Sequence, residues 1–218
     1  MDSVSGVGVI DKAVAILQAL ASGPMDLGDL QVSSGLPRAT AHRLVVALER
    51  HHLVRRDGQG RFCLGFELVA LGRHAADQFD IAEVAVPILR ALRDECGESV
   101  QLSVREDEAR RCVISLQSPH ALRWIVAEGG LLPLEVGSAG RVLAGGTLSG
   151  GGWIESVEER EPGAASVSAP VRDGTGHVVA AVSVSGPVER LSRQPGKRFG
   201  KAVVAAGDRL TEVLTKRG

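Results

Sequence analysis

The residues best suited to contact a charged or polar partner lie in the run LPRATAHRLVVALER at positions 36–50. In a helix, basic and hydrogen-bonding side chains would share one face: Arg38, His42, Arg43 and Arg50. The opposite face would be apolar: Ala41, Leu44, Val45 and Leu48. Because proline is tolerated in the first turn of a helix, Pro37 marks the start. The pattern predicts a helix with its back in a core and a basic front.

The first turns of this helix have residue types that can read DNA in the major groove. Arginine can bind guanine through two hydrogen bonds, and small side chains can contact the thymine methyl group. Contacts with base edges and nearby phosphates are expected from five residues: Arg38, Ala39, Thr40, His42 and Arg43. For His42 alone, a surface histidine without a DNA contact is an equally good interpretation.

Positive charge is concentrated around this helix. The whole chain of 218 residues has a formal net charge of −1, whereas residues 36–66 carry six arginines against Glu49 and Asp57, a local net charge of +4. Such a patch supplies the salt-dependent phosphate attraction of a module that binds double-stranded DNA. The alternative is a solvated arginine-rich face without a partner.

Two helices are expected before the basic one. Asp11 can cap a first helix that Ser22-Gly23-Pro24 ends, with an apolar stripe of Val14, Ile16, Leu17 and Leu20. A second, shorter helix has as its buried candidates Leu27, Leu30 and Val32. The turn Ser33-Ser34-Gly35 then leads directly into the basic helix. Two short helices joined by a glycine-containing turn are typical of a helix-turn-helix.

A β-hairpin is predicted directly after the basic helix. Residues 53–56 and 61–64 have the pattern of two short strands, and the turn residues DGQG lie between them at 57–60. Such a wing places three arginines near the sugar-phosphate backbone: Arg55, Arg56 and Arg61. The sequence therefore predicts a winged helix-turn-helix domain over residues 1–65.

The rest of the chain predicts a linker helix over residues 66–79 and an α+β domain over residues 80–218. Asp80-Ile81-Ala82-Glu83 has the form of a capping box, for a helix that runs to about Cys96 and contains Pro87. Strands are expected at 100–104, 113–116, 122–126, 165–170 and 178–185, and a short helix at 137–144. A last helix presents one apolar face to the sheet: Phe199, Val203, Ala206, Leu210 and Leu214. Strands grouped between helices favour an antiparallel sheet.

Several classes of protein are disfavoured by composition and motifs. The sequence has no run of about 18 apolar residues and no signal-peptide pattern, so a cytoplasmic protein without membrane contact is expected. Cys63, Cys96 and Cys112 are widely spaced, which predicts buried thiols and neither a disulfide framework nor a metal site. No nucleophile elbow, phosphate-binding glycine loop or HExxH motif occurs, so we expect neither an enzyme nor a cofactor.

Several strings resemble one known family. Residues 8–13 (GVIDKA), 35–44 (GLPRATAHRL) and 60–65 (GRFCLG) resemble the DNA-binding module of IclR-type transcriptional regulators. The resemblance continues through residues 137–144 (GSAGRVLA), 169–173 (APVRD) and 180–187 (AAVSVSGP). It implies a GAF-like effector-binding domain and a dimer or dimer of dimers on a pseudo-palindromic operator. Residues 40–44 and 158–163 are most similar to the NdgR/LtbR subgroup, which is linked to leucine and other amino-acid metabolism.

The resemblance also implies a site for a small amino acid or organic acid. Its residues in this chain would be Ser138, Ala139, Ser156, Ser166, Ser183 and Ser185. Ser183 and Ser185 share one face of a strand, and backbone donors at the start of the short helix suit a carboxylate. An apolar wall could come from Trp124, Leu132 and Leu134. Serines on a half-exposed strand without a ligand are the alternative.

This chain departs from the family pattern between Ala144 and Gly152. Only the glycine-rich run GGTLSGG fills residues 145–151, where relatives carry a longer, partly helical segment that closes over the pocket. Ser156 also stands where some relatives have an acidic side chain. A natural shortening, a deletion and a degenerate pocket are all compatible with the run. A metabolite-sensing or protein-interaction module with a weakened pocket is therefore the alternative function.

Overall fold

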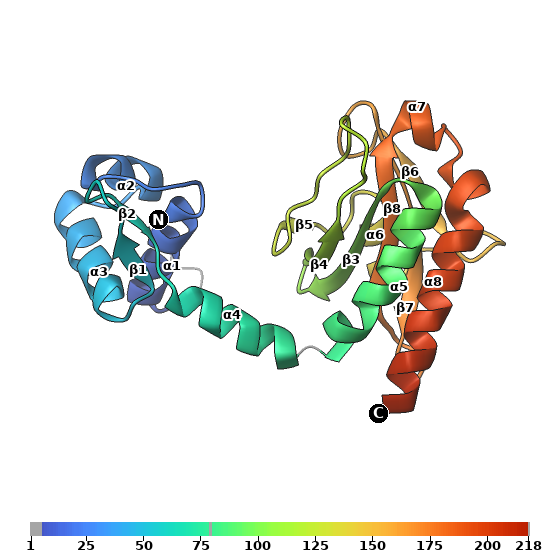
Figure 1. Ribbon diagram of the computed structural model, residues 1–218, viewed down its shortest axis with the longest axis horizontal. Helices are drawn as coiled ribbons and strands as arrows, with labels where there is room; N and C mark the ends of the chain where they lie inside the picture. Colours follow the sequence, from blue (N-terminus) through green and yellow to red (C-terminus); the bar gives the residue numbers. More distant parts are fainter. Residues whose placement is uncertain (1–5, 79, 218) are drawn as a thin grey trace. The chain divides into compact units, whose positions relative to one another are not determined.

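The computed structural model describes residues 6–78 and 80–217, and the chain divides into two compact units, Met1–Gln78 and Phe79–Gly218 (Figure 1). The first unit contains, in chain order, α1 (Gly8–Leu20), α2 (Leu27–Ser34), α3 (Arg38–Arg50), β1 (Val54–Arg56), β2 (Phe62–Leu64) and α4 (Glu67–Gln78). The second contains α5 (Asp80–Cys96), β3 (Ser99–Glu106), β4 (Ala109–Leu116), β5 (Leu131–Pro133), α6 (Ser138–Leu143), β6 (Ile154–Val157), β7 (Ala164–Arg172), β8 (Val178–Pro187), α7 (Val188–Leu191) and α8 (Pro195–Arg217). The predicted α+β class with an N-terminal helix-turn-helix is confirmed.

The basic helix lies where the sequence predicts it. Pro37 is the residue before the first turn of α3, and Ala41, Val45 and Leu48 are buried. They pack in one cluster with residues of α1, α2 and the hairpin: Ile16, Leu20, Leu30, Val54 and Phe62. This shared core fixes which face of α3 points outward, because a helix can bury only one apolar stripe against its neighbours.

Two details of the preceding helices differ from the prediction. α1 begins at Gly8 with Val7 as the N-cap residue, so Asp11 lies in the first turn and is not the cap. In α2 the side chain of Asp26 accepts a hydrogen bond from the Asp29 amide (2.9 Å) and so sets the start. Leu30 is then fully buried, whereas Val32, two residues further around the helix, is 81% exposed. Val14 is also exposed.

The turn of the helix-turn-helix depends on Gly35. This residue ends α2 in the left-handed conformation (φ 65°), which glycine adopts without steric strain. Leu36 directly after it is buried, although it belongs to neither helix. The chain therefore reverses over a few residues and positions the start of α3.

The wing is a two-stranded antiparallel hairpin in which Arg55 is opposite Cys63 and Arg56 is opposite Phe62. Each strand is one residue shorter than expected. The carboxylate of Asp57 holds the turn by accepting hydrogen bonds from the amides of Gln59 (2.9 Å) and Arg61 (3.0 Å). Backbone hydrogen bonds between Met25 and Phe62 (2.9 and 2.8 Å) tie β2 to the segment before α2.

The second unit is built on a six-stranded antiparallel sheet with the strand order β5-β4-β3-β8-β7-β6. Helices α5 and α8 lie side by side over one face of this sheet (Figure 1). Alternate residues of the central strands enter the core under these helices: Val100, Leu102, Val167, Ala169, Val182 and Val184. The intervening residues of the same strands face α6, and they are mainly polar.

Other expectations for the second unit were partly wrong. Residues 122–126 are not a strand, and two of their carbonyls accept hydrogen bonds from side chains instead: the Ser99 hydroxyl donates to the Trp124 carbonyl (2.7 Å) and Arg190 donates to the Leu122 carbonyl (2.9 Å). The edge strands β5 and β6 were not predicted. The capping box at 80–83 falls on residues whose side chains lie outside the described part of the structure. Residues 6–78 and 80–217 include no helix long and apolar enough to span a membrane.

Candidate functional site

The face of α3 that points away from the core carries the predicted DNA-contacting residues. Arg38, Ala39, His42 and Arg43 are exposed, and Thr40 is half-buried. Thr40 and Arg43 line an open groove of about 420 Å³ together with Lys12 and Val9 of α1 and Leu44. The sequence interpretation missed Lys12, which lies one residue beyond Asp11 in a helix not expected to reach this surface.

The three arginines of the wing are in different environments. Arg56 pairs with Glu49 of α3 (3.1 Å), and its guanidinium lies 4.1 Å from the centre of the Phe62 ring. Arg61 pairs with Asp57 (2.8 Å). Arg55 is exposed, with its guanidinium 5.0 Å from the Phe66 ring centre, and it has no carboxylate partner among the described residues. Arg55 is therefore the wing arginine whose charge is available to an external anion.

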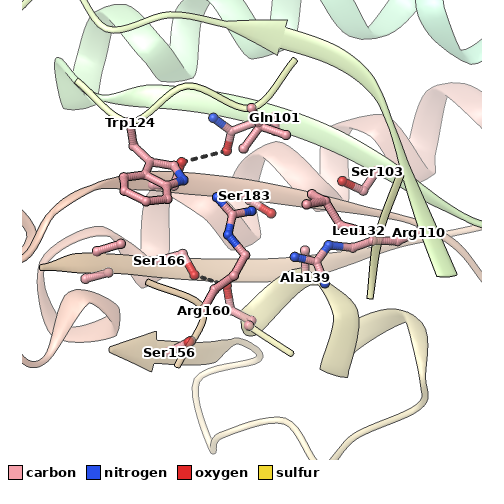
Figure 2. A pocket seen from close by; sticks show the side chains of 16 residues that line it. Gln101, Ser103, Arg110, Trp124, Leu132, Ala139, Ser156, Arg160, Ser166 and Ser183 are labelled. Carbon is pink, nitrogen blue, oxygen red and sulfur yellow. Dashed lines mark hydrogen bonds between the residues drawn. The ribbon is translucent and has the colours of Figure 1, made fainter. Parts of the chain in front are cut away.

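A pocket lies between α6 and the polar face of β3, β7 and β8 (Figure 2). It encloses a cavity of about 60 Å³. All six predicted effector-site residues line it: Ser138, Ala139, Ser156, Ser166, Ser183 and Ser185. Of the proposed apolar wall, Trp124 and Leu132 also line the pocket, whereas Leu134 is buried with the apolar residues of α6. The alternation of β8 explains the convergence, because Ser183 and Ser185 face α6 while Val182 and Val184 enter the core.

The serines of the pocket form a connected network of hydroxyl groups. The hydroxyl of Ser138 in α6 lies 2.6 Å from that of Ser166 and 2.7 Å from that of Ser168. Ser168 also lies 2.7 Å from the hydroxyl of Ser183 on the neighbouring strand. Ser168 is fully buried and was missed in the sequence, although its spacing of two residues from Ser166 places both on one face of β7.

Replacing Ser168 by Ala should lower the free energy of unfolding of the second unit by about 1–3 kcal/mol, because the buried hydroxyls of Ser138 and Ser183 each lose a partner. Both tryptophans of the chain, Trp124 and Trp153, belong to this unit, so tryptophan fluorescence in a urea titration reports its unfolding. An unchanged midpoint and slope would show that the network does not stabilise the fold.

Two arginines of the pocket were not predicted. Arg110 of β4 is buried and donates to the carbonyls of Pro133 (2.5 Å) and Val136 (2.6 Å). Burial, and then the charge of Arg160, lower the pKa of Arg110 to about 10. Arg160 lies in the loop before β7, and burial lowers its pKa as well. At neutral pH both guanidinium groups are charged. The signal in the sequence was weak, because Arg110 and Arg160 stand in runs of charged residues that are typical of exposed turns.

Gly140 allows Arg110 to pass close to α6. A Cβ atom at Gly140 would overlap the guanidinium of Arg110 and the backbone carbonyl of Leu134. Any larger residue would therefore displace either the helix or the arginine. This close approach brings a cationic group from the edge of the sheet into the wall of the pocket.

One of the backbone donors that the sequence suggested for a carboxylate ligand, at the start of α6, is already occupied. The amide of Gly137 already donates to the carboxylate of Glu159 (3.2 Å), which also pairs with Arg141 (3.1 Å). This expectation was therefore wrong for the Gly137 amide.

No residue of the glycine-rich run is among the described residues that line the pocket. The amide of Ser149 donates to the carbonyl of Trp153 (2.8 Å) and that of Gly152 to the carbonyl of Ser149 (2.9 Å), so residues 149–153 form a tight turn. Trp153 packs against the core under α8. The two loops that meet at the pocket are joined by Arg160 and Trp124, whose guanidinium and ring centre lie 5.1 Å apart.

A winged helix-turn-helix unit followed by an α+β unit with a polar pocket is the architecture of a transcriptional regulator with separate DNA-binding and effector-binding domains. The chain belongs to the IclR family of bacterial transcriptional regulators. Residues 9–58 match the IclR helix-turn-helix domain, and residues 73–145 and 149–212 match the bacterial transcriptional regulator IclR C-terminal domain. The second match is interrupted at residues 146–148, within the glycine-rich run. The prediction that the protein is not an enzyme is confirmed, since both families consist of regulators.

Curated relatives and solved structures agree with this assignment. The chain is 30% identical to the glycerol operon regulatory protein of Streptomyces griseus, over 84% of this chain and 85% of that protein. It is 25% identical to the transcriptional repressor IclR of Escherichia coli, over 93% and 88% of the two chains. The fold matches Thermotoga maritima IclR (TM-score 0.75, 17% identity, 95% and 98% covered). It also matches an IclR homologue from Microbacterium hydrocarbonoxydans in complex with 4-hydroxybenzoate (TM-score 0.80, 20% identity, 94% and 98% covered).

Proposed function

We propose that this regulator binds a pseudo-palindromic operator with α3 in the major groove, as a dimer or dimer of dimers. The observation that carries the proposal is the exposed face of α3, on which Arg38, Arg43 and Arg50 have no carboxylate partner among the described residues. With Arg55 they account for the local charge of +4, since Glu49 and Asp57 pair with the two remaining arginines. Four unpaired guanidinium groups on one unit suit a phosphate backbone.

Self-association is supported by apolar side chains in and beside α4. Phe66, Val69 and Leu71 are 74%, 52% and 51% exposed, so large apolar side chains remain accessible in and beside this helix. A second copy of the chain would cover them and set two α3 helices about one turn of DNA apart. Light scattering coupled to size-exclusion chromatography checks the oligomer; a monomer at micromolar concentration would contradict this part of the proposal.

Regulation by a small metabolite, an amino acid or organic acid, is the second part of the proposal. It is supported by the pocket at α6 and by the complex of a related fold with 4-hydroxybenzoate. The ligand must prefer one arrangement of the subunits, because equal affinity for both would leave DNA binding unchanged. If the protein binds metabolites but shows no preference for any DNA sequence, the alternative of a sensing or interaction module is favoured.

The controlled genes are proposed to serve amino-acid metabolism, leucine included. This rests on residues 40–44 and 158–163, whose sequence is similar to that of the NdgR/LtbR subgroup. The names of the Streptomyces relatives point instead to a glycerol operon. Sequencing of genomic fragments that the purified protein retains would separate the two: enrichment upstream of glycerol genes alone would overturn the amino-acid assignment.

The central test is a selection of bound sequences from a random duplex pool, followed by fluorescence anisotropy with the selected and a shuffled duplex at several salt concentrations. A specific regulator should bind the selected duplex about 10³-fold or more tightly than the shuffled one. Equal affinity for both, or failure of the selection to converge, would contradict operator binding.

Replacing Arg55 by Ala should weaken binding to every duplex alike. One lost phosphate contact per subunit should reduce the slope of log K against log salt by about 0.9 for each subunit. Arg105→Ala, in an exposed hairpin of the second unit, is the matched control and should leave the slope unchanged. A loss that depends on the sequence of the duplex would show that Arg55 reads bases.

A further inference from the structure

We propose that the effector is a small dianion, held between Arg110 and Arg160 and oriented by the amide of Gln101. This inference rests on the proposed function, since it assigns a chemical class to the ligand of the same pocket. Arg110, Arg160 and Gln101 are not among the site residues that the resemblance to the family implies. Figure 2 shows Arg110 and Arg160 entering the pocket from different sides, and Gln101 lies on β3, the strand next to that of Arg110.

The charge of the pocket is the first argument. Among the described residues, its lining includes two arginines and no aspartate or glutamate. Neither guanidinium has a carboxylate partner within 4.0 Å among the described residues, whereas Arg111, next to Arg110 in β4, pairs with Glu106. Two like charges in a partly buried site repel each other, and each loses hydration. An anion between them would relieve both effects.

The hydrogen-bonding groups of the pocket give the second argument, which is independent of charge. Gln101 is 4% exposed, and its Oε1 accepts a hydrogen bond from Ser185 (2.9 Å). Its Nε2 is buried and has no partner among the described residues, although it belongs to a residue of the pocket wall. Buried donors are rarely left unpaired in native proteins, so an acceptor atom of a ligand is the natural partner.

These groups also indicate what the pocket disfavours. A zwitterionic amino acid would bring an ammonium group, for which the lining offers two cations and no carboxylate. A neutral polyol would form hydrogen bonds with the serine hydroxyls, but it would leave the charges of both guanidinium groups without a counter-ion. A cavity needs about 10–15 Å³ per water molecule, so 60 Å³ has room for only a few such atoms without movement of the loops. A compact dicarboxylate or phosphate monoester matches the charge and the hydrogen-bonding groups, and one larger than the cavity needs movement of these loops.

The test uses the full chain and a panel of probes at pH 7.5 and constant ionic strength. The dianions are malonate and glycerol 3-phosphate, which separate the dicarboxylate from the phosphate class; lactate, L-leucine and glycerol are the monoanionic, zwitterionic and neutral probes. Thermal shift and isothermal titration calorimetry should show tighter binding of at least one dianion than of the other three probes. Equal or tighter binding of lactate, leucine or glycerol, or no measurable binding of either dianion, would overturn the proposal.

Two variants test the residues themselves. Arg160→Gln changes a half-buried loop residue and should weaken the dianion roughly 10- to 100-fold, as expected for loss of a charged hydrogen-bonding group. Gln101→Met should weaken it about tenfold by removing the unpaired donor. Arg105→Gln, which removes the same charge from the exposed hairpin, should bind as the wild type does. If Arg160→Gln binds the dianion like Arg105→Gln, the clamp does not exist.

DNA binding of the ligand-free protein is measured in parallel with the selected duplex. Sequence-specific binding without any response to dianions overturns the ligand class and leaves the regulator intact. Tight dianion binding with no preference among duplexes overturns the proposed function and leaves the assignment of the pocket standing. The two assays therefore distinguish failure of the ligand assignment from failure of the proposed function.

Discussion

Replacing Arg43 by Ala is expected to remove most of the discrimination between the operator and other sequences. Arg43 is exposed in the second turn of α3 and lines the groove that also contains Thr40 and Lys12. A bidentate arginine–guanine contact is worth about 1–3 kcal/mol of discrimination. In a dimer both half-sites lose it, so the ratio of specific to nonspecific affinity should fall by about 2–6 kcal/mol, or roughly 30- to 25,000-fold.

Arg50→Ala is the matched control for this prediction. Arg50 is exposed on the same helix but lies in its last turn, away from the end expected to enter the groove. It should change overall affinity and salt dependence more than the specificity ratio. Anisotropy with the selected and shuffled duplexes measures both quantities. If Arg43→Ala and Arg50→Ala reduce specificity by the same factor, α3 does not read bases through its N-terminal turns.

Replacing Arg190 by Met should destabilise the second unit by about 3–5 kcal/mol, because it leaves the carboxylate of Glu98 buried without its partner. The side chain of Glu98 is 4% exposed, and it accepts hydrogen bonds from Nε (2.5 Å) and Nη2 (2.9 Å) of Arg190. Arg190 also donates to the carbonyl of Leu122, in the loop that carries Trp124 to the pocket. Its loss should therefore both lower stability and loosen that loop.

Urea unfolding followed by tryptophan fluorescence measures this effect on the second unit. Arg193→Met removes a neighbouring but exposed ion pair with Glu158 and should cost at most about 1 kcal/mol. The double variant Glu98→Met/Arg190→Met should be more stable than Arg190→Met alone, since it no longer buries an unpaired charge. If the single and double variants unfold at the same urea concentration, the buried carboxylate is not the cause of the destabilisation.

Local patterns in the sequence were sufficient for most elements of the fold. The helical spacing of Ala41, Val45 and Leu48 and the position of Pro37 predict α3 with its bounds, because a helix with one buried stripe has a repeat that is visible in the sequence. The alternation of Val182, Ser183, Val184 and Ser185 likewise predicts two faces of β8. The turn residues at 57–60 predict the hairpin. These features depend on residues close together in the chain.

Predictions failed where longer-range contacts override local preference. Val32 was expected in the core on its apolar character, but the start that Asp26 imposes on α2 turns it to solvent. Residues 122–126 have the composition of a strand, yet two of their carbonyls accept hydrogen bonds from the distant side chains of Ser99 and Arg190. In each case the decisive partner is set by packing or by a distant side chain, so a local pattern could not reveal it.

By itself the sequence determined the two-domain organisation and the basic recognition helix. It also indicated the serines of the pocket, through resemblance to a family. Only the tertiary structure decided which charges remain unpaired. It pairs Arg56 with Glu49 and leaves Arg55 without a carboxylate partner among the described residues. It also brings Arg110 of β4 and Arg160 of a distant loop to one cavity with the side-chain amide nitrogen of Gln101, which has no partner in the described part of the chain. The physical reason is that helix and strand periodicity arise from local backbone geometry and are therefore visible in the sequence. A binding site instead combines side chains that are far apart in the chain, and their spacing in the sequence does not reveal that the fold brings them together.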